Sequence, residues 1–161
     1  FHIYLPAVAS PVADSTAAGT STADAARPPR GRILVMDDDE GVRFGLVACL
    51  QQLGYLVEET ADGQAAIDAY RGAHARQEPP DVVILDLTVR GAMGGLDALQ
   101  GIRQIDSQVA AIVISGYADN EVLRDYRRFG FRSALAKPFT TDTLRQALAE
   151  ARSAQPTARA T

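Results

Sequence analysis

The sequence predicts an α/β fold in which helices cover both faces of a five-stranded parallel sheet, a doubly wound arrangement. From Arg32 onward, short runs of β-branched residues and leucine alternate five times with longer segments of helical period. Three of the short runs are almost wholly apolar, which is typical of strands buried on both faces of a parallel sheet. Such regular alternation favours a sheet wrapped by helices over a bundle or a sandwich.

The predicted strands are short and lie between helical segments. They cover Ile33–Met36, Tyr55–Glu58, Val82–Leu85, Ala111–Ile114 and Ala134–Ala136. Right-handed crossovers between successive strands would bring their carboxyl ends to one rim of the sheet. In doubly wound sheets the functional site forms beyond that rim, so residues at strand ends are the first candidates.

The first two helices are predicted from apolar stripes and end signals. The first stripe consists of Val42, Leu46, Cys49, Leu50 and Leu53. Gly54 follows it and is a natural stop. Asp62 can cap the second helix. Its apolar face consists of Ala66, Ala69, Tyr70 and Ala73, ahead of Pro79–Pro80.

Three further helices complete the pattern. The third covers Leu96–Ile105, with Gly94–Gly95 in front of it. Asn120 can cap a fourth, which carries Val122, Tyr126 and Phe129 and ends at Gly130. Thr140 or Thr141 opens the fifth. The stripe of this last helix consists of Leu144, Ala147, Leu148 and Ala151.

Composition bounds the class of protein. With 161 residues, of which 47% are hydrophobic, the chain can bury a core of its own, and the length favours one domain. A net charge of −4 argues against direct nucleic-acid binding. The single cysteine, Cys49, excludes an internal disulfide and a Cys-rich zinc site, and fits a cytoplasmic protein. No apolar run is long enough for a membrane helix, so no membrane contact by this segment is expected.

Acidic residues follow two of the predicted strands. Asp37–Glu40 comes directly after the first strand, and Asp86 directly after the third. Carboxylates that converge at one rim repel each other unless a cation is present, and hard oxygen ligands suit Mg²⁺. Taken singly, each has a plainer interpretation, because acids stabilise helix N-termini and Asp is common in turns. Together at strand ends, they indicate a metal site.

Two further side chains belong to the same predicted rim. Lys137 ends the fifth strand and Ser115 ends the fourth. Taken singly, Lys-Pro is usually just a turn and Ser115 would be a helix cap. An ammonium, a hydroxyl and an acidic pocket are the parts needed to bind and transfer a phosphoryl group. We expect the ammonium of Lys137 to face the phosphoryl group and not the core, so replacing Lys137 by alanine should leave the fold intact.

Four separated segments resemble the receiver domains of two-component response regulators. They are Ile33–Glu40, Asp81–Leu87, Ile112–Gly116 and Lys137–Phe139, in the family's order. The resemblance covers about Arg32 to Ala151. It implies a flavodoxin-like sheet of strand order 2-1-3-4-5 and a role in phosphorelay signalling. The expected partner is a histidine kinase or a histidine phosphotransfer domain, and dimerisation is left open.

The same resemblance implies roles for single residues. Asp86 would accept the phosphoryl group, and Mg²⁺, or Mn²⁺ in its place, would be held by Asp86, by Asp38 directly and by Asp37 partly through water. The backbone carbonyl of Thr88 would be a further ligand. Lys137 would pair with a phosphoryl oxygen, and Ser115 would hydrogen-bond to the phosphoryl group as a switch. Such a domain assists its own phosphorylation and dephosphorylation.

The sequence departs from the family pattern at three points. Arg90 stands where the family usually has proline, and the loop through Gly94–Gly95 is one residue longer than the common form. Ala134 replaces the aromatic residue of the family's switch, whose part Tyr117 or Phe131 would have to take. The loop from Asp86 to Gly95 resembles that of receivers fused to sensor histidine kinases.

These resemblances predict a domain organisation. Residues 1–6 resemble the last strand of a kinase ATP-binding domain, and residues 7–31, rich in Ala, Ser, Thr, Pro and Gly, are expected to be a flexible linker. Residues 32–152 are expected to form the receiver domain, and residues 153–161 a disordered tail. The parent chain would then be a hybrid histidine kinase, a transferase.

Two other classes of protein share parts of this pattern. Asp37 and Asp39 after an apolar strand also fit the nucleophile motif of haloacid dehalogenase phosphatases, but Glu40 stands where that class needs threonine. A nucleotide-binding doubly wound domain would need a glycine-rich loop after its first strand, where this chain has acids.

Overall fold

The predicted doubly wound sheet is confirmed by the computed structural model, which describes residues 28–116 and 121–153. All five strands are parallel, in the order β2-β1-β3-β4-β5. Their bounds are β1 Arg32–Met36, β2 Leu56–Thr60, β3 Val82–Asp86, β4 Ala111–Ser115 and β5 Ser133–Ala136. The chain order reverses between β1 and β3, so the site expected beyond this switch point lies at the ends of these two strands.

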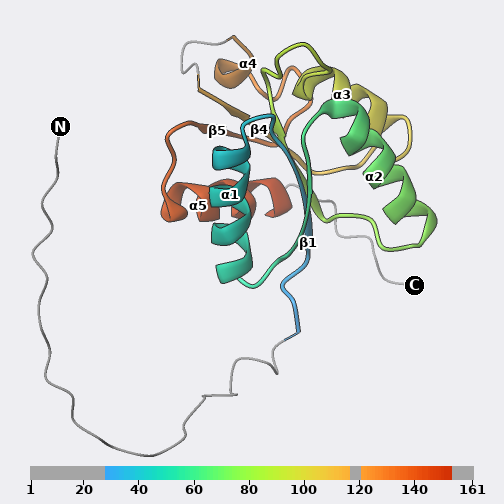
Figure 1. Cartoon of the computed structure of the whole chain (residues 1–161), viewed down its shortest axis with the longest axis horizontal. Helices are drawn as coiled ribbons and strands as arrows, with labels where there is room; N and C mark the ends of the chain where they lie inside the picture. The colour runs from blue at the N-terminus through green and yellow to red at the C-terminus, as the bar shows by residue number, and fades with distance from the viewer. Residues whose placement is uncertain (1–27, 117–120, 154–161) are drawn as a thin grey trace, which may run out of the picture.

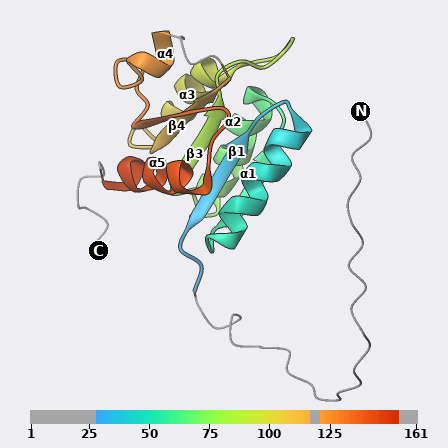
Figure 2. The same cartoon turned by 90° about the vertical axis from the view of Figure 1, so that its left-hand side faces the viewer.

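Helices cover both faces of the sheet, as Figures 1 and 2 show. They are α1 Glu40–Gln52, α2 Gly63–Ala75, α3 Gly95–Arg103, α4 Glu121–Arg124 and α5 Thr141–Ser153. Helices α1 and α5 lie on one face, and α2 and α3 lie on the other (Figure 1). No helix in the described ranges is both long enough and apolar enough to cross a lipid bilayer.

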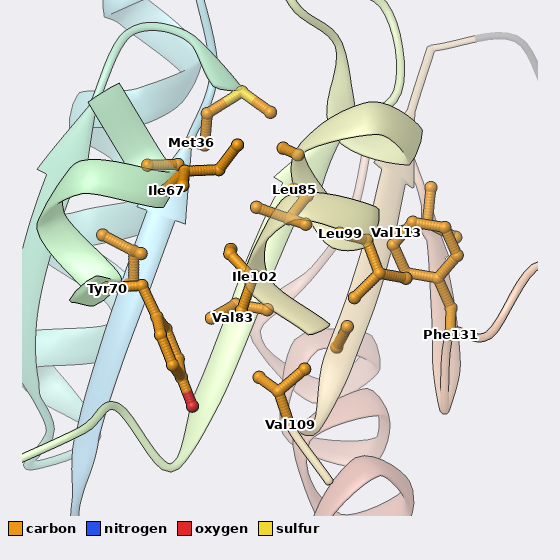
Figure 3. Close-up of a cluster of buried hydrophobic side chains, with 14 of the residues drawn as sticks. Met36, Ile67, Tyr70, Val83, Leu85, Leu99, Ile102, Val109, Val113 and Phe131 are labelled. Atoms are coloured by element: carbon orange, nitrogen blue, oxygen red, sulfur yellow. The ribbon is translucent and has the colours of Figure 1, made fainter. Parts of the chain in front are cut away.

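Two apolar clusters pack on opposite faces of the sheet. Because alternate residues of a strand point to opposite faces, Leu34 and Met36 of β1 join the cluster under α2 and α3, while Ile33 and Val35 join the cluster under α1 and α5. Figure 3 shows the first cluster, in which Ile67 of α2 lies near Met36 of β1, and Tyr70 of α2 lies near Val83 of β3. The three central strands are therefore apolar almost throughout, as predicted.

Helix ends follow the predicted caps where the structure describes them. The Asp62 carboxylate accepts a hydrogen bond from the backbone N–H of Ala65 and begins α2. The Thr140 hydroxyl accepts from the backbone N–H of Thr143, so Thr140 caps the fifth helix. The second strand begins one residue later than predicted, because the N–H of Tyr55 bonds to the carbonyl of Leu50 at the end of α1.

The fourth helix is shorter than predicted. It covers Glu121–Arg124, and turns occupy the residues up to Gly130. The N–H of Arg128 bonds to the carbonyl of Asp125, three residues back. The hydrogen bonds to the fourth residue back that define an α-helix have therefore ended there. The predicted cap, Asn120, lies outside the described residues, as do residues 1–6 and most of the predicted linker.

Candidate functional site

Acidic side chains meet beyond the ends of β1 and β3. Asp37 follows β1 directly, Asp38 comes next, and Asp86 is the last residue of β3. One carboxylate oxygen from each of the three lies within 4.8 Å of the others. Because β1 and β3 are neighbouring parallel strands, their carboxyl ends coincide, and the convergence expected from sequence is present.

Asp37 is fully buried and both of its carboxylate oxygens are engaged. Its Oδ1 accepts from the backbone N–H of Asp39 at 3.0 Å, and its Oδ2 accepts from Nζ of Lys137 at 2.6 Å. Arg43, in α1, donates to the Asp37 backbone carbonyl at 2.7 Å. With hydrogen bonds to both carboxylate oxygens and to the backbone carbonyl, the buried Asp37 has a fixed orientation without a bound ligand.

Lys137 directly follows β5, and its side chain contacts residues at the ends of β1 and β3. Its Nζ lies 2.6 Å from Asp37 Oδ2 and 3.2 Å from Asp86 Oδ1, and its side chain is only 18% exposed. Burial by itself would lower the pKa of Lys137, but the hydrogen bonds and charges of Asp37 and Asp86 outweigh it and raise that pKa. The ammonium is therefore charged at neutral pH. Lys137 is also the only lysine in the chain.

Asp86 is buried, and its surroundings disfavour its ionisation. Burial, helped by the charges of Asp37 and Asp38, outweighs the attraction of Lys137 and raises the pKa of this carboxyl to about 6. Gly95, the first residue of α3, packs directly on its backbone, since a Cβ there would lie 2.6 Å from the Asp86 carbonyl oxygen. The Gly94–Gly95 pair thus lets the loop fold back onto the end of β3.

Asp38 and Asp39 have different places at the rim. Asp38 is the least buried of the three acids, and its Oδ2 accepts from the backbone N–H of Arg90 at 3.3 Å. Asp39 caps α1 by accepting from the N–H of Val42 at 3.0 Å, and this hydrogen bond lowers its pKa. Asp39 is not in the group of three, so it serves the helix and not the cluster.

Ser115 and Thr88 also lie at this rim. Ser115 is the last residue of β4, is fully buried, and its backbone carbonyl accepts from the N–H of Lys137 at 2.8 Å. Thr88 is exposed, two residues beyond β3. Their predicted roles toward a phosphoryl group and a metal ion concern ligands, and remain predictions.

The donor set fits a hard divalent cation. It consists of carboxylate oxygens, the ligands that Mg²⁺ and Mn²⁺ accept, and includes no sulfur or imidazole. When all three acids are ionised, Lys137 balances one charge and the rest favour a cation. Asp38 is the most accessible of the three, whereas the oxygens of Asp37 are already engaged.

Sequence reasoning missed two contributors to this site. Arg43 binds the Asp37 carbonyl and pairs with Glu59 at 3.3 Å, and Arg90 donates its N–H to Asp38. A signal existed for Arg43, because a basic residue one turn into a helix opposes the helix dipole and suggests another role. For Arg90 the signal was the absence of the family's usual proline, since every residue except proline has a backbone N–H to donate.

We expect Mg²⁺ to stabilise the chain more at pH 7.5 than at pH 5. The raised pKa of Asp86 means that the folded state holds this proton more tightly than the unfolded state does. Stability without metal is therefore lost as pH rises from about 4 through about 6, and the ionised carboxylate then becomes available to a cation. Thermal melts with and without millimolar Mg²⁺ at both pH values measure this difference.

Asp38→Ala is the matched control for this experiment, because it removes the exposed carboxylate and leaves the buried pair of Asp37 and Lys137 in place. It should abolish most of the Mg²⁺ shift at either pH. A shift of equal size at pH 5 and pH 7.5, or one that survives in Asp38→Ala, would rule out this cluster as the metal site.

Comparisons with known proteins agree with this geometry. The family model described as the response regulator receiver domain matches residues 33–149. The chain is 30% identical over 117 residues to Sporulation initiation phosphotransferase F of Bacillus subtilis (strain 168), covering 73% of this chain and 90% of that protein.

Two further comparisons extend this result. The chain is 32% identical over 115 residues to the Sensor kinase CckA of Brucella abortus (strain 2308), covering 70% of this chain and 11% of that protein. A crystal structure of a two-component response regulator of the LuxR family, from Aurantimonas sp. SI85-9A1, aligns with a TM-score of 0.67 and 28% identity, covering 78% of this chain and 86% of the other. The matches span the sheet and its acidic rim.

Proposed function

The chain belongs to the response regulator receiver domain family, a family of phosphoacceptors in two-component signalling, and from this premise we propose that Asp86 is the residue phosphorylated. The observation that carries the proposal is the environment of its carboxylate. Asp86 ends a buried strand, contacts Lys137 at 3.2 Å, and shares a pocket with two further acids. Both carboxylate oxygens of Asp37 are engaged, and Asp38 is the least buried of the three acids, so Asp86 is the carboxylate best placed as nucleophile.

The reaction is a transfer between two protein side chains. A carboxylate oxygen of Asp86 attacks the phosphorus of a phosphohistidine in line with the breaking bond. A P–O bond forms, the P–N bond breaks, and the histidine nitrogen leaves with the electron pair and takes up a proton. The product is an acyl phosphate on Asp86 and a neutral histidine on the donor.

Residues around Asp86 supply charge and hydrogen bonds for this transfer. The ammonium of Lys137, already directed at Asp86 Oδ1, can pair with a phosphoryl oxygen. Ser115 lies at the end of the neighbouring strand and offers a hydroxyl to the phosphorylated form. Asp37, Asp38, Asp86 and the carbonyl of Thr88 would hold Mg²⁺ or Mn²⁺. The cation would neutralise charge on the phosphoryl oxygens.

The donor is a histidine kinase or a histidine phosphotransfer protein, and a groove beside the site fits its approach. The groove has a volume of about 520 Å³ and is lined by Gly41, Val42, Gly45, Leu46, Cys49, Lys137, Pro138 and Phe139. It is mainly apolar and includes Lys137, so a helix seated in it would lie beside the phosphoacceptor. Phe44, on the neighbouring flank of α1, is 75% exposed and adds apolar surface.

Filling this groove should slow transfer from a protein donor but spare transfer from a small one. A Cβ at Gly45 would meet nothing within 4 Å, and Gly45 lines the groove, so Gly45→Leu should fold normally and occupy the groove. We expect about a tenfold lower transfer rate from a phosphohistidine protein, the size of one interface hot spot. The rate with a small phosphodonor such as acetyl phosphate should change by less than about twofold. Radiolabel transfer measures both rates.

Gly72→Leu is the matched control, because it makes the same change within α2, where only the flexible Arg76 side chain is near. It should leave both rates unchanged. Equal rates for Gly45→Leu and the parent chain with the protein donor would place the docking surface elsewhere.

We further propose that the chain is the receiver part of a hybrid histidine kinase. The match to Sensor kinase CckA supports this. It covers only 11% of that protein, so the matching segment there is a small part of a much longer sensor kinase. The longer loop between Asp86 and Gly95 supports it as well.

A further inference from the structure

Arg90 lies at the open side of the acidic cluster. Its backbone N–H donates to Asp38 Oδ2 at 3.3 Å, and Asp38 is the least buried member of the group. The next residue, Gly91, has a φ of +69°, which lets the loop turn back toward Gly94 and the end of β3. The loop is thus held against the cluster by the N–H bond at Arg90 and by the close packing at Gly94–Gly95.

The guanidinium of Arg90 differs from the other cations at this rim. Lys137 is paired with Asp37 and Asp86, and Arg43 with the Asp37 carbonyl and Glu59. Arg90 is exposed, and within residues 28–116 and 121–153 no carboxylate lies within ion-pair distance of its side chain.

An unpaired guanidinium beside an acidic pocket acts oppositely on cations and anions. It repels a divalent cation that approaches Asp38, and it attracts an anionic group that approaches Asp86. Arginine also presents its donors in a planar fork that matches two oxygens of a phosphoryl group. The long side chain, anchored beside Asp38, can reach an anion held at Asp86, whose carboxylate is in the same cluster.

We propose that Arg90 determines ligand specificity at this site. Its guanidinium pairs with outward-facing oxygens of the phosphoryl group while that group is transferred to Asp86. This inference rests on the proposed function and extends it by adding a second cation, on the solvent side, to Lys137 on the core side. The positive charge of Arg90 also weakens the binding of Mg²⁺ while no phosphoryl group is present. A bound phosphoryl group offsets this repulsion. The ligand class is a tetrahedral, doubly charged phosphoryl group or its mimic.

The test is calorimetric titration of the full 161-residue chain, first with Mg²⁺ alone and then with beryllofluoride at saturating Mg²⁺. Arg90→Ala removes the guanidinium but keeps the N–H that Asp38 accepts. We expect it to bind Mg²⁺ about twofold more tightly and beryllofluoride about fivefold more weakly, the range of exposed charge pairs. Arg90→Lys should keep at least half of the parent affinity for beryllofluoride, because the charge remains.

Arg71→Ala is the control, since it removes one exposed cation from α2, where Arg71 pairs with Asp68 and not with the cluster. It should change neither affinity. Opposite shifts in Arg90→Ala identify a charge effect, whereas weaker binding of both ligands would mean a damaged pocket and would overturn the proposal. So would unchanged affinities, or an Arg90→Lys variant that behaves like alanine. If the parent chain binds Mg²⁺ but no beryllofluoride, the proposed function fails together with this inference.

Discussion

Replacing Lys137 by methionine is expected to lower the free energy of unfolding of the metal-free chain by about 3 kcal/mol, the lower end of the cost of removing one partner from a buried ion pair. The change leaves Asp37 fully buried, with its Oδ2 deprived of the 2.6 Å hydrogen bond from the ammonium. It also leaves three carboxylates in one pocket without their buried cation. Methionine keeps most of the apolar stem, so lost packing contributes little.

Urea unfolding at pH 7.5 measures this cost, and Mg²⁺ should reduce it. A divalent cation bound by the same carboxylates replaces part of the missing charge, so the deficit should shrink at millimolar Mg²⁺. Arg71→Met is the control, because its pair with Asp68 is exposed and should contribute under about 1 kcal/mol. Equal unfolding curves for Lys137→Met and the parent chain would show that the ammonium is not part of the folded core of the site.

This expectation differs from the one that the sequence supports. From its place at the end of the fifth strand, Lys137 is predicted to face a phosphoryl group and to be dispensable for folding. In the structure its ammonium is already bound by two carboxylates, one of them a hundred residues away along the chain. Such a pairing depends on the distance and angle between side chains at the ends of β1, β3 and β5, with β4 between the last two, and residue spacing does not encode this geometry.

The rim itself could be predicted because parallel topology is so restrictive. Once the apolar runs ending at Met36 and Leu85 are taken as neighbouring parallel strands, the acids that follow them must lie together. The same reasoning places Ser115 and Lys137 beside each other, and the backbone of Ser115 does bond to that of Lys137. Strand ends are thus the part of this fold where sequence carries the most information about function.

The segment after β4 could not be predicted as well. Tyr126 has the spacing of a helical stripe, but its hydroxyl donates to Glu150 Oε1 at 2.7 Å, while Ser133 donates to Oε2 at 2.8 Å. One carboxylate of α5 therefore holds β5 and the turn beyond α4, and these contacts override local helix propensity. Of the two aromatic residues suggested in place of an aromatic at Ala134, Phe131 is buried in the core, and Tyr117 lies outside the described residues.

Phosphorylation of the chain is expected at Asp86 and nowhere else. Asp86 is the buried carboxylate that ends a strand, faces Lys137 and belongs to the acidic cluster. Asp86→Asn should abolish labelling by acetyl phosphate with Mg²⁺, because an amide oxygen is too weak a nucleophile to form the acyl phosphate. The variant should keep the helical content of the parent chain, since asparagine has nearly the same shape.

The most direct measurement is reductive trapping of the acyl phosphate followed by peptide mass spectrometry. With acetyl phosphate and Mg²⁺, the label should appear on the peptide that contains Asp86, and it should be absent from Asp86→Asn. Label on Asp37 would contradict the account and favour the phosphatase class. Retention of the label in Asp86→Asn, or no label in a parent chain that binds Mg²⁺, would show that Asp86 is not the phosphoacceptor.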